Sequence, residues 1–249
     1  MRLSIITCTY NCYHSIRETL SSLKVDQHFE IEHVIIDGNS DDGTLKILND
    51  YRDSSNYNVF IKSEEDKGIY DAMNKGLLRA SGEFILFLLA GDKLSIQIDT
   101  LFEMLKRNNK KDILAFSGYF KTPEGDKEFW NRADYKLSLY NPAIRFPCLI
   151  IKKSIYKELG FFDLQFKISS DFDLISKYLR NKNNIKNFNE PLLLMEPFGF
   201  SSKPKNFYLK KQEHKKIISY TPLSIKKISF LIRNYKHMAL FTLKRVLKK

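Results

Sequence analysis

Short apolar segments alternate with segments of helical spacing over the first ninety or so residues, and this alternation constrains the fold more than any other feature. Strands are expected at 2–8 (RLSIITC), 31–37 (IEHVIID), 58–63 (NVFIKS) and 83–89 (EFILFLL), with helices at 13–24, 44–51 and 70–80 between them. Strand–helix alternation at such short intervals predicts a parallel, doubly wound sheet. The strands are almost continuously apolar, which is typical of strands covered by helices on both faces.

The pattern changes after a further helix expected at 101–108. Strand-like pieces are expected at 113–120, 128–133, 147–151 and 184–196, with helices at 153–159 and 171–180. No internal repeat or low-complexity linker separates these pieces from the first half. We therefore expect one α/β domain over 1–202, followed by a basic helical extension over 203–249.

The net charge of +12 is concentrated near the end of the sequence. Residues 205–249 contain 13 of the 41 Lys and Arg but only one of the 29 acidic residues, Glu213, so the remainder is neutral. Within 222–248, apolar residues recur at helical spacing, namely Ile225, Ile228, Ile232, Tyr235, Ala239, Leu243 and Val246. Basic side chains fall on the opposite face of the helix expected there. This pattern predicts an amphipathic helix on an anionic membrane surface; a helix docked on the domain is the alternative.

Several function classes lack their sequence signals. There is no GxGxxG after the first strand, no P-loop, no HExxH and no GxSxG, and the three cysteines show no CxxC spacing. Aromatic residues among the basic residues near the end fit the apolar helical face, and no nucleic-acid-binding motif accompanies them, so nucleic acid is not an expected partner. No apolar run is long enough to span a bilayer. A reduced, cytoplasmic protein is expected.

Acidic residues stand at or just beyond the expected strand ends. They are Asp37, Asp66 and Asp92. In a parallel sheet these ends share one edge, where ligands bind, and the carboxylates there repel each other unless a cation or ligand donors compensate them. This pattern suits a divalent cation that holds a diphosphate. For Asp37 the alternative is an Asx-turn in the loop GNSDDG, and we adopt that interpretation for Asp41 and Asp42.

The segments IITCTYN, VIIDGNSDDGT, EEDKGIYDAMNKGLLRASGEFILFLLAGD, KELGFFD and ISSDFDL occur in this order. Together they resemble the family-2 glycosyltransferases of GT-A fold, above all bacterial enzymes that assemble O-antigen, capsule or exopolysaccharide. The resemblance covers about residues 1–202. It implies a nucleotide-binding half fused to a mixed acceptor half. It also implies inverting transfer from a nucleotide-sugar, with UDP favoured, to a glycan or polyprenyl-diphosphate-linked saccharide, with Mg²⁺ or Mn²⁺. Location on the inner face of the plasma membrane would follow.

The resemblance also assigns residues. Thr9, Tyr10 and Asn11 would line the nucleotide pocket, and Asp37 would contact the base or ribose. Further positions that match family residues are Asp66 and Asn74 near the nucleotide, Asp92 as the metal contact and Asp171 as the general base. From its local sequence alone, Asp171 could instead be an N-cap, with Asp173 as a first-turn acid.

The sequence departs from the family pattern at the strand-end motif. Leu89 stands where the family usually has an acid or Asn, and Gly91 where it often has an acid. A two-carboxylate metal site is therefore not expected from this strand. The QxxRW motif of processive synthases is absent, which favours addition of a single sugar. A degenerate nucleotide-sugar-binding protein, a nucleotidyltransferase and a polyanion-binding module remain alternatives.

Overall fold

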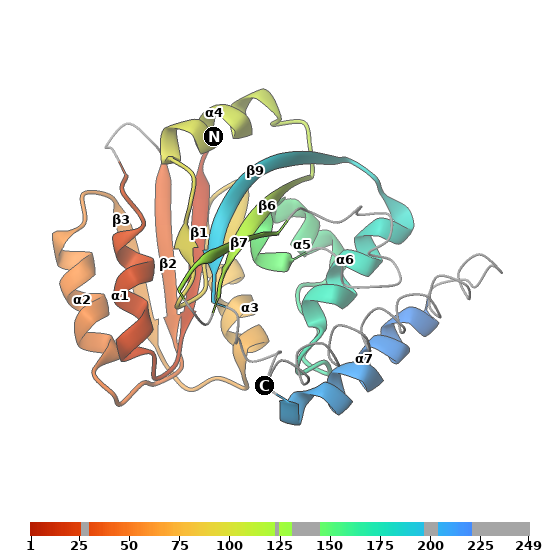
Figure 1. Ribbon diagram of the computed structural model, residues 1–249, viewed down its shortest axis with the longest axis horizontal. Coiled ribbons are helices and arrows are strands. Elements are labelled where there is room, and N and C mark those ends of the chain that lie inside the picture. Colours follow the sequence, from red (N-terminus) through yellow and green to blue (C-terminus); the bar gives the residue numbers. More distant parts are fainter. Residues whose placement is uncertain (26–29, 123–124, 131–144, 197–203, 221–249) are drawn as a thin grey trace.

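The computed structural model describes residues 1–25, 30–122, 125–130, 145–196 and 204–220, and its centre is a mixed β-sheet with helices on both faces (Figure 1). The strand order is β3-β2-β1-β4-β8-β6-β9-β5, and β7 pairs with β6. The predicted amphipathic helix at 222–248 lies outside the described residues. No helix within them is long and apolar enough to cross a membrane.

The first half of the sheet is parallel, as the alternation predicted. Its elements are β1 (Leu3–Thr9), α1 (Tyr13–Ser21), β2 (Ile31–Asp37), α2 (Thr44–Ser54), β3 (Asn58–Ser63), α3 (Ile69–Arg79) and β4 (Phe84–Phe87). β1 pairs in parallel with β2 on one side and with β4 on the other. Open α/β sheets bind ligands at such a switch in strand order, at the carboxyl ends of the strands.

Alternate side chains of β2 pack against helices on opposite faces of the sheet. Ile35 packs with residues of α1 and α2, whereas Val34 and Ile36 pack with α3. α3 lies very close to the sheet, since a Cβ on its Gly76 would come within 2.5 Å of Cγ2 of Ile6. Because α1, α2 and α3 each follow a strand, their N-termini lie at the carboxyl edge of the sheet.

β4 is shorter than the strand expected at 83–89. The N–H of Leu88 still donates to the backbone oxygen of Ile6 on β1 (3.0 Å), but the N–H of Asp92 then closes a turn on the oxygen of Leu89 (3.0 Å). Gly91 adopts φ +101° in this turn, a region that favours glycine. Asp92 therefore follows a turn and directly precedes the short strand β5 (Lys93–Leu94).

The second half of the sheet is mixed. Its further elements are α4 (Ile98–Arg107), β6 (Ile113–Lys121), β7 (Lys127–Trp130), η2 (Phe146–Cys148), β8 (Leu149–Lys152), α5 (Lys153–Leu159), α6 (Ser170–Asn181) and β9 (Ile185–Met195). β8 runs antiparallel to β4 and β6, while β9 is parallel to β6 and antiparallel to β5. α5 and α6 share a core with α3, and α4 packs on the other face. The expected α/β fold with a mixed second half is confirmed.

After η4 (Pro204–Asn206), helix α7 (Phe207–Ser219) packs beside α6 (Figure 1). Its Ile217 is fully buried against Phe166 and Phe172. The carboxylate of Glu213 is also buried, and it accepts hydrogen bonds from the N–H groups of Lys167 (2.7 Å) and Ile168 (3.1 Å). The first part of the predicted extension is thus bound to the domain, while the boundary at residue 202 stays a prediction.

Candidate active site at the carboxyl edge of the sheet

Asp37 ends β2 in register with Thr9 of β1 and Ser63 of β3. Its fully buried carboxylate accepts hydrogen bonds from the hydroxyl groups of Thr9 (2.8 Å), Ser40 (2.6 Å) and Ser63 (2.7 Å), and from the N–H of Ser40 (2.9 Å). Four donors compensate the buried charge. Asp37 therefore fixes three strand ends and the loop after β2; its contact with a base or ribose stays a prediction.

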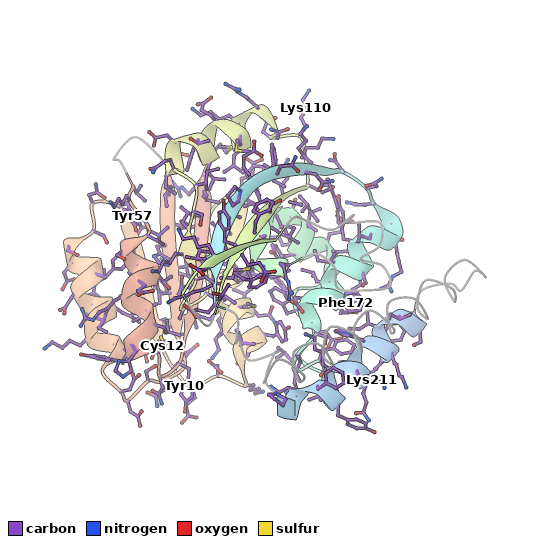
Figure 2. The ribbon with its side chains drawn as sticks, viewed as in Figure 1. Tyr10, Cys12, Tyr57, Lys110, Phe172 and Lys211 are labelled. Atoms are coloured by element: carbon purple, nitrogen blue, oxygen red, sulfur yellow. The ribbon has the colours of Figure 1, made fainter. Side chains whose placement is uncertain are left out.

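Hydrogen bonds join the loop after β1 to the loop after β2. The N–H of Asn11 donates to Oγ of Ser40 (2.9 Å), and the N–H of Asp41 donates to Oδ1 of Asn11 (3.0 Å). The joined loops leave 68% of Tyr10 exposed, at the edge of the molecule opposite Lys110 (Figure 2). An exposed aromatic ring on a fixed loop is a surface on which a planar base can stack.

Asp66, after β3, turns back towards these loops. Its Oδ1 accepts a hydrogen bond from the N–H of Gly68 (2.7 Å). A Cβ at Gly38 would lie 2.7 Å from Oδ2 of Asp66 and 3.3 Å from Cδ2 of Tyr10. The structure thus brings Asp66 and Tyr10 together, and a side chain at position 38 would displace the carboxylate of Asp66.

Asp92 is 8% exposed, and its Oδ1 accepts a hydrogen bond from the N–H of Glu196 (3.2 Å), the residue after β9. Burial raises the pKa of Asp92 to about 7; the hydrogen bond opposes this rise, and the charge of Glu196 adds to it. Glu196 was not singled out in the sequence. It lies 104 residues from Asp92 in a segment without a recognisable motif, so only the strand pairing reveals it.

The carboxylate oxygens of Asp92 are suitable ligands for Mg²⁺ or Mn²⁺. Mg²⁺ is usually held by one or two carboxylates, while substrate phosphates and water complete its coordination. Within the described ranges, no group of three His, Cys, Asp or Glu could hold a metal ion. Burial disfavours the ionised form of Asp92, and a nearby positive charge favours it. A cation that also binds a diphosphate would therefore stabilise the ionised carboxylate of Asp92.

Asp171 lies in the first turn of α6, where Ser169 is the N-cap, so the N-cap alternative for Asp171 is wrong. Asp173 is a first-turn acid, as expected. Oη of Tyr70 lies 3.0 Å from Oδ1 of Asp171 and 2.8 Å from the backbone oxygen of Ile168. Tyr70 is in the first turn of α3, so this contact holds Asp171 at the carboxyl edge. Burial raises the pKa of Asp171, which makes its carboxylate a stronger base.

Asn74 on α3 is paired with backbone. Its Nδ2 donates to the oxygen of Phe162 (2.9 Å), and its Oδ1 accepts from the N–H of Phe162 (3.0 Å). The ring of Phe162 packs against that of Tyr70, with ring centroids 5.4 Å apart. Asn74 therefore fixes the segment beside Tyr70, and its contact with the nucleotide-sugar stays a prediction.

Two basic side chains near Asp171, those of Lys210 and Arg145, were not expected as site residues. Lys210 lies three residues before the buried Glu213, which places it on the docked face of α7. Burial lowers the pKa of Lys210, the charge of Asp171 raises it, and the charge of Arg145 lowers it. The sequence offered Lys210 only as one of many charges near the end. The two cations give this part of the edge a positive charge next to a carboxylate.

More than half of the chain matches a family model. The model is described as glycosyl transferase family 2, and it matches residues 4–168. The chain belongs to this family. The match includes the loops around Asp37 and the turn at Asp92, and it ends before Asp171 and α7.

Individual relatives agree with this assignment. A PGL/p-HBAD biosynthesis glycosyltransferase of Mycobacterium bovis is 26% identical over 246 residues, which cover 93% of this chain and 90% of that protein. S. aureus TarS 1–349 in complex with UDP-GlcNAc has TM-score 0.67 and 22% identity over 93% of this chain and 70% of its own. The chain spans 42% of the longer TarS structure.

A second solved structure is the mannosyltransferase PcManGT from Pyrobaculum calidifontis in complex with GDP-Man and Mn²⁺. It has TM-score 0.70 and 18% identity, and the match covers 93% of this chain and 68% of its own. At such identity these structures show the fold alone. The predicted family and GT-A fold are confirmed, and the protein is a glycosyltransferase.

Proposed function

We propose that the protein transfers one sugar, with inversion at the anomeric carbon, from a nucleotide-sugar to a hydroxyl group of a glycan or lipid-linked saccharide in surface polysaccharide assembly. The observation that carries this proposal is the half-buried Asp171, whose carboxylate Tyr70 contacts at the carboxyl edge. Asp37, Asp66 and Asp92 stand at or just beyond the ends of strands that end at this same edge. A base and a donor site can therefore meet there.

On the donor side, the base of the nucleotide stacks on Tyr10, between the joined loops and Asp66. Thr9 and Asn11 shape this pocket through their hydrogen bonds to Asp37 and to the loop after β2. A UDP-sugar is the favoured donor, and the solved TarS complex with UDP-GlcNAc supports it. The PcManGT complex holds GDP-Man, so the test below includes GDP.

The donor diphosphate lies near Asp92, which would hold Mg²⁺ or Mn²⁺. Bound there, the cation would offset the charge that develops on the leaving diphosphate. The turn at Gly91 and the N–H of Glu196 fix the orientation of Asp92.

Asp171 accepts the proton of the attacking hydroxyl group. The bond from the hydroxyl oxygen forms on the face of the anomeric carbon opposite the diphosphate, so configuration inverts in one displacement. Oη of Tyr70 contacts one oxygen of Asp171 and thereby orients the carboxylate. Because burial raises its pKa, Asp171 holds an abstracted proton more firmly than an exposed aspartate would.

The acceptor approaches Asp171 at the carboxyl edge, where the charges of Lys210 and Arg145 favour a substrate with an anionic group. A polyprenyl-diphosphate-linked saccharide has this charge. The basic amphipathic pattern at 222–248 would hold the protein on the inner face of the plasma membrane, where such an acceptor resides.

Thermal unfolding with UDP, dTDP and GDP, each with and without Mn²⁺, tests the donor site. A ligand of the folded state adds about 2.7 kcal/mol of stability at a hundredfold excess over its dissociation constant. We expect a shift of the midpoint with UDP that requires Mn²⁺. If no nucleotide shifts the midpoint, the donor site is not functional and the alternative of a degenerate protein gains support.

Asp171→Asn tests the base. We expect this variant to bind UDP and Mn²⁺ as the wild type does and to lose sugar transfer. Turnover close to that of the wild type would remove Asp171 from this role. Donor binding without transfer in the wild type, over a panel of lipid-linked and free glycans, would favour a nucleotide-sugar-binding protein.

A further inference from the structure

Glu196 lies opposite Gly91, a position of the strand-end motif at which this sequence lacks an acid. β5 and β9 pair antiparallel, with Lys93 opposite Leu194 and Leu94 opposite Leu193. The same register, continued by two residues, places Gly91 opposite Glu196. A Cβ on Gly91 would lie 3.2 Å from Cγ of Glu196, so the side chain of Glu196 passes over the position where many family members carry an acid.

We infer that Glu196 provides the second carboxylate for the divalent cation at Asp92, in place of the acid missing at positions 89 and 91. This inference rests on the proposed metal-dependent donor binding. Leu89 has no ligand atom, and its side chain packs against the hydrophobic core that α3 shares with α5 and α6. The glycine at position 91 is then not a loss of function, because it leaves the space that Glu196 uses.

The contacts of Glu196 allow its carboxylate to exchange between Lys121 and a bound cation. Its backbone N–H is bonded to Asp92, so the two residues stay side by side whatever the side chain of Glu196 does. The side chain of Glu196 is 43% exposed, and its Oε1 lies 3.3 Å from Nζ of Lys121, whose side chain is 41% exposed. Exposed ion pairs of this kind contribute little stability. Lys121 can therefore release Glu196 when a cation binds.

Two carboxylates on one cation leave most of its coordination positions to phosphate and water. The described residues provide no group of three possible metal ligands. We therefore expect Mn²⁺ to bind weakly to the protein alone and more tightly when UDP is present. Loss of one carboxylate from such a small set weakens Mn²⁺ binding by about 10- to 100-fold, as loss of a supporting partner of a metal ligand already does.

The test is Mn²⁺ binding to the full chain, measured from the electron paramagnetic resonance signal of free Mn²⁺, with and without UDP. Glu196→Gln is expected to weaken binding by about 10- to 100-fold. Glu196→Asp should restore part of it. Glu190→Gln, at an exposed position of β9, is the matched control and should bind as the wild type does. Lys121→Gln should tighten binding, because it removes a competitor for Glu196.

The outcomes separate this inference from the proposed function. If Asp92→Asn loses Mn²⁺ while Glu196→Gln and Lys121→Gln bind it like the wild type, the inference is overturned and metal-dependent donor binding stands. If the wild type binds no Mn²⁺ even with UDP, both are overturned. Thermal unfolding of each variant without ligand confirms that it is folded, and Glu196→Gln should change this little since its backbone contact to Asp92 remains.

Discussion

Asp92→Asn should make the protein more stable and at the same time unable to bind its donor. Asparagine keeps Oδ1, which accepts the hydrogen bond from Glu196, but it carries no charge. Asp92 is 8% exposed, and its pKa is raised from 3.8 to about 7. This difference corresponds to about 4 kcal/mol of stability, which the wild type lacks once the carboxylate is ionised.

The direction in which stability changes with pH follows from proton binding at Asp92. Between about pH 4 and pH 7 the folded protein binds a proton at Asp92 that the unfolded chain does not, so stability from this residue falls as pH rises through this range. The Asp92→Asn variant does not lose this stability as the pH rises, because asparagine does not ionise. Its free energy of unfolding should exceed that of the wild type by up to about 4 kcal/mol at pH 8, and by little near pH 4.

Urea unfolding at pH 4.5, 6 and 8 measures these free energies, with the exposed Asp50→Asn as control. At pH 8, saturating UDP and Mn²⁺ should stabilise the wild type and leave the Asp92 variant unchanged. If the wild type and Asp92→Asn show the same change of stability between pH 4.5 and 8, the carboxylate is not destabilised by burial and the reasoning fails.

Three further outcomes are expected. Gly38→Ala places a Cβ 2.7 Å from Oδ2 of Asp66 and should weaken UDP binding about tenfold in calorimetry, a loss of about 1.4 kcal/mol; unchanged affinity would separate Gly38 from the donor site. Lys210→Gln removes a charge that lowers the pKa of Asp171. The acidic limb of the pH–rate profile should move to higher pH, by less than the roughly 1–3 units of a contacting pair, whereas Lys215→Gln should not move it. Truncation after Tyr220 should release the protein from membranes with transfer to a soluble acceptor retained; equal membrane binding by both chains would exclude the segment after Tyr220 as the anchor.

The first half of the fold could be predicted because its information is local. The strands at 31–37 and 58–63 occur with the predicted bounds, since a short apolar run that ends in polar loop residues predicts a strand by itself. The predicted strand at 83–89 was too long, because the run FILFLL continues through a turn that depends on β1 and Gly91. The antiparallel pairings of the second half join distant segments, and no local pattern encodes them.

The residues of the candidate site also fall into those that local sequence predicts and those that depend on contacts between distant segments. Asp37, Asp66 and Asp92 could be named from the sequence, since each stands at or just beyond the end of a strand of the regular half. Glu196 could not, because its relation to Asp92 depends on the pairing of β5 with β9. Lys210 could not either, since its charge is one of thirteen in the basic segment.

Glu213 links α7 to the proposed chemistry. It is the single acid among the basic residues of 205–249, and no pattern in the sequence assigned it a contact. Its carboxylate holds the N–H of Ile168, whose backbone oxygen lies 2.8 Å from Oη of Tyr70, and the same Oη lies 3.0 Å from Asp171. The position of the proposed base therefore depends on α7. A chain cut at residue 202 would lose this support together with any membrane contact, so only a cut after α7 separates membrane binding from catalysis.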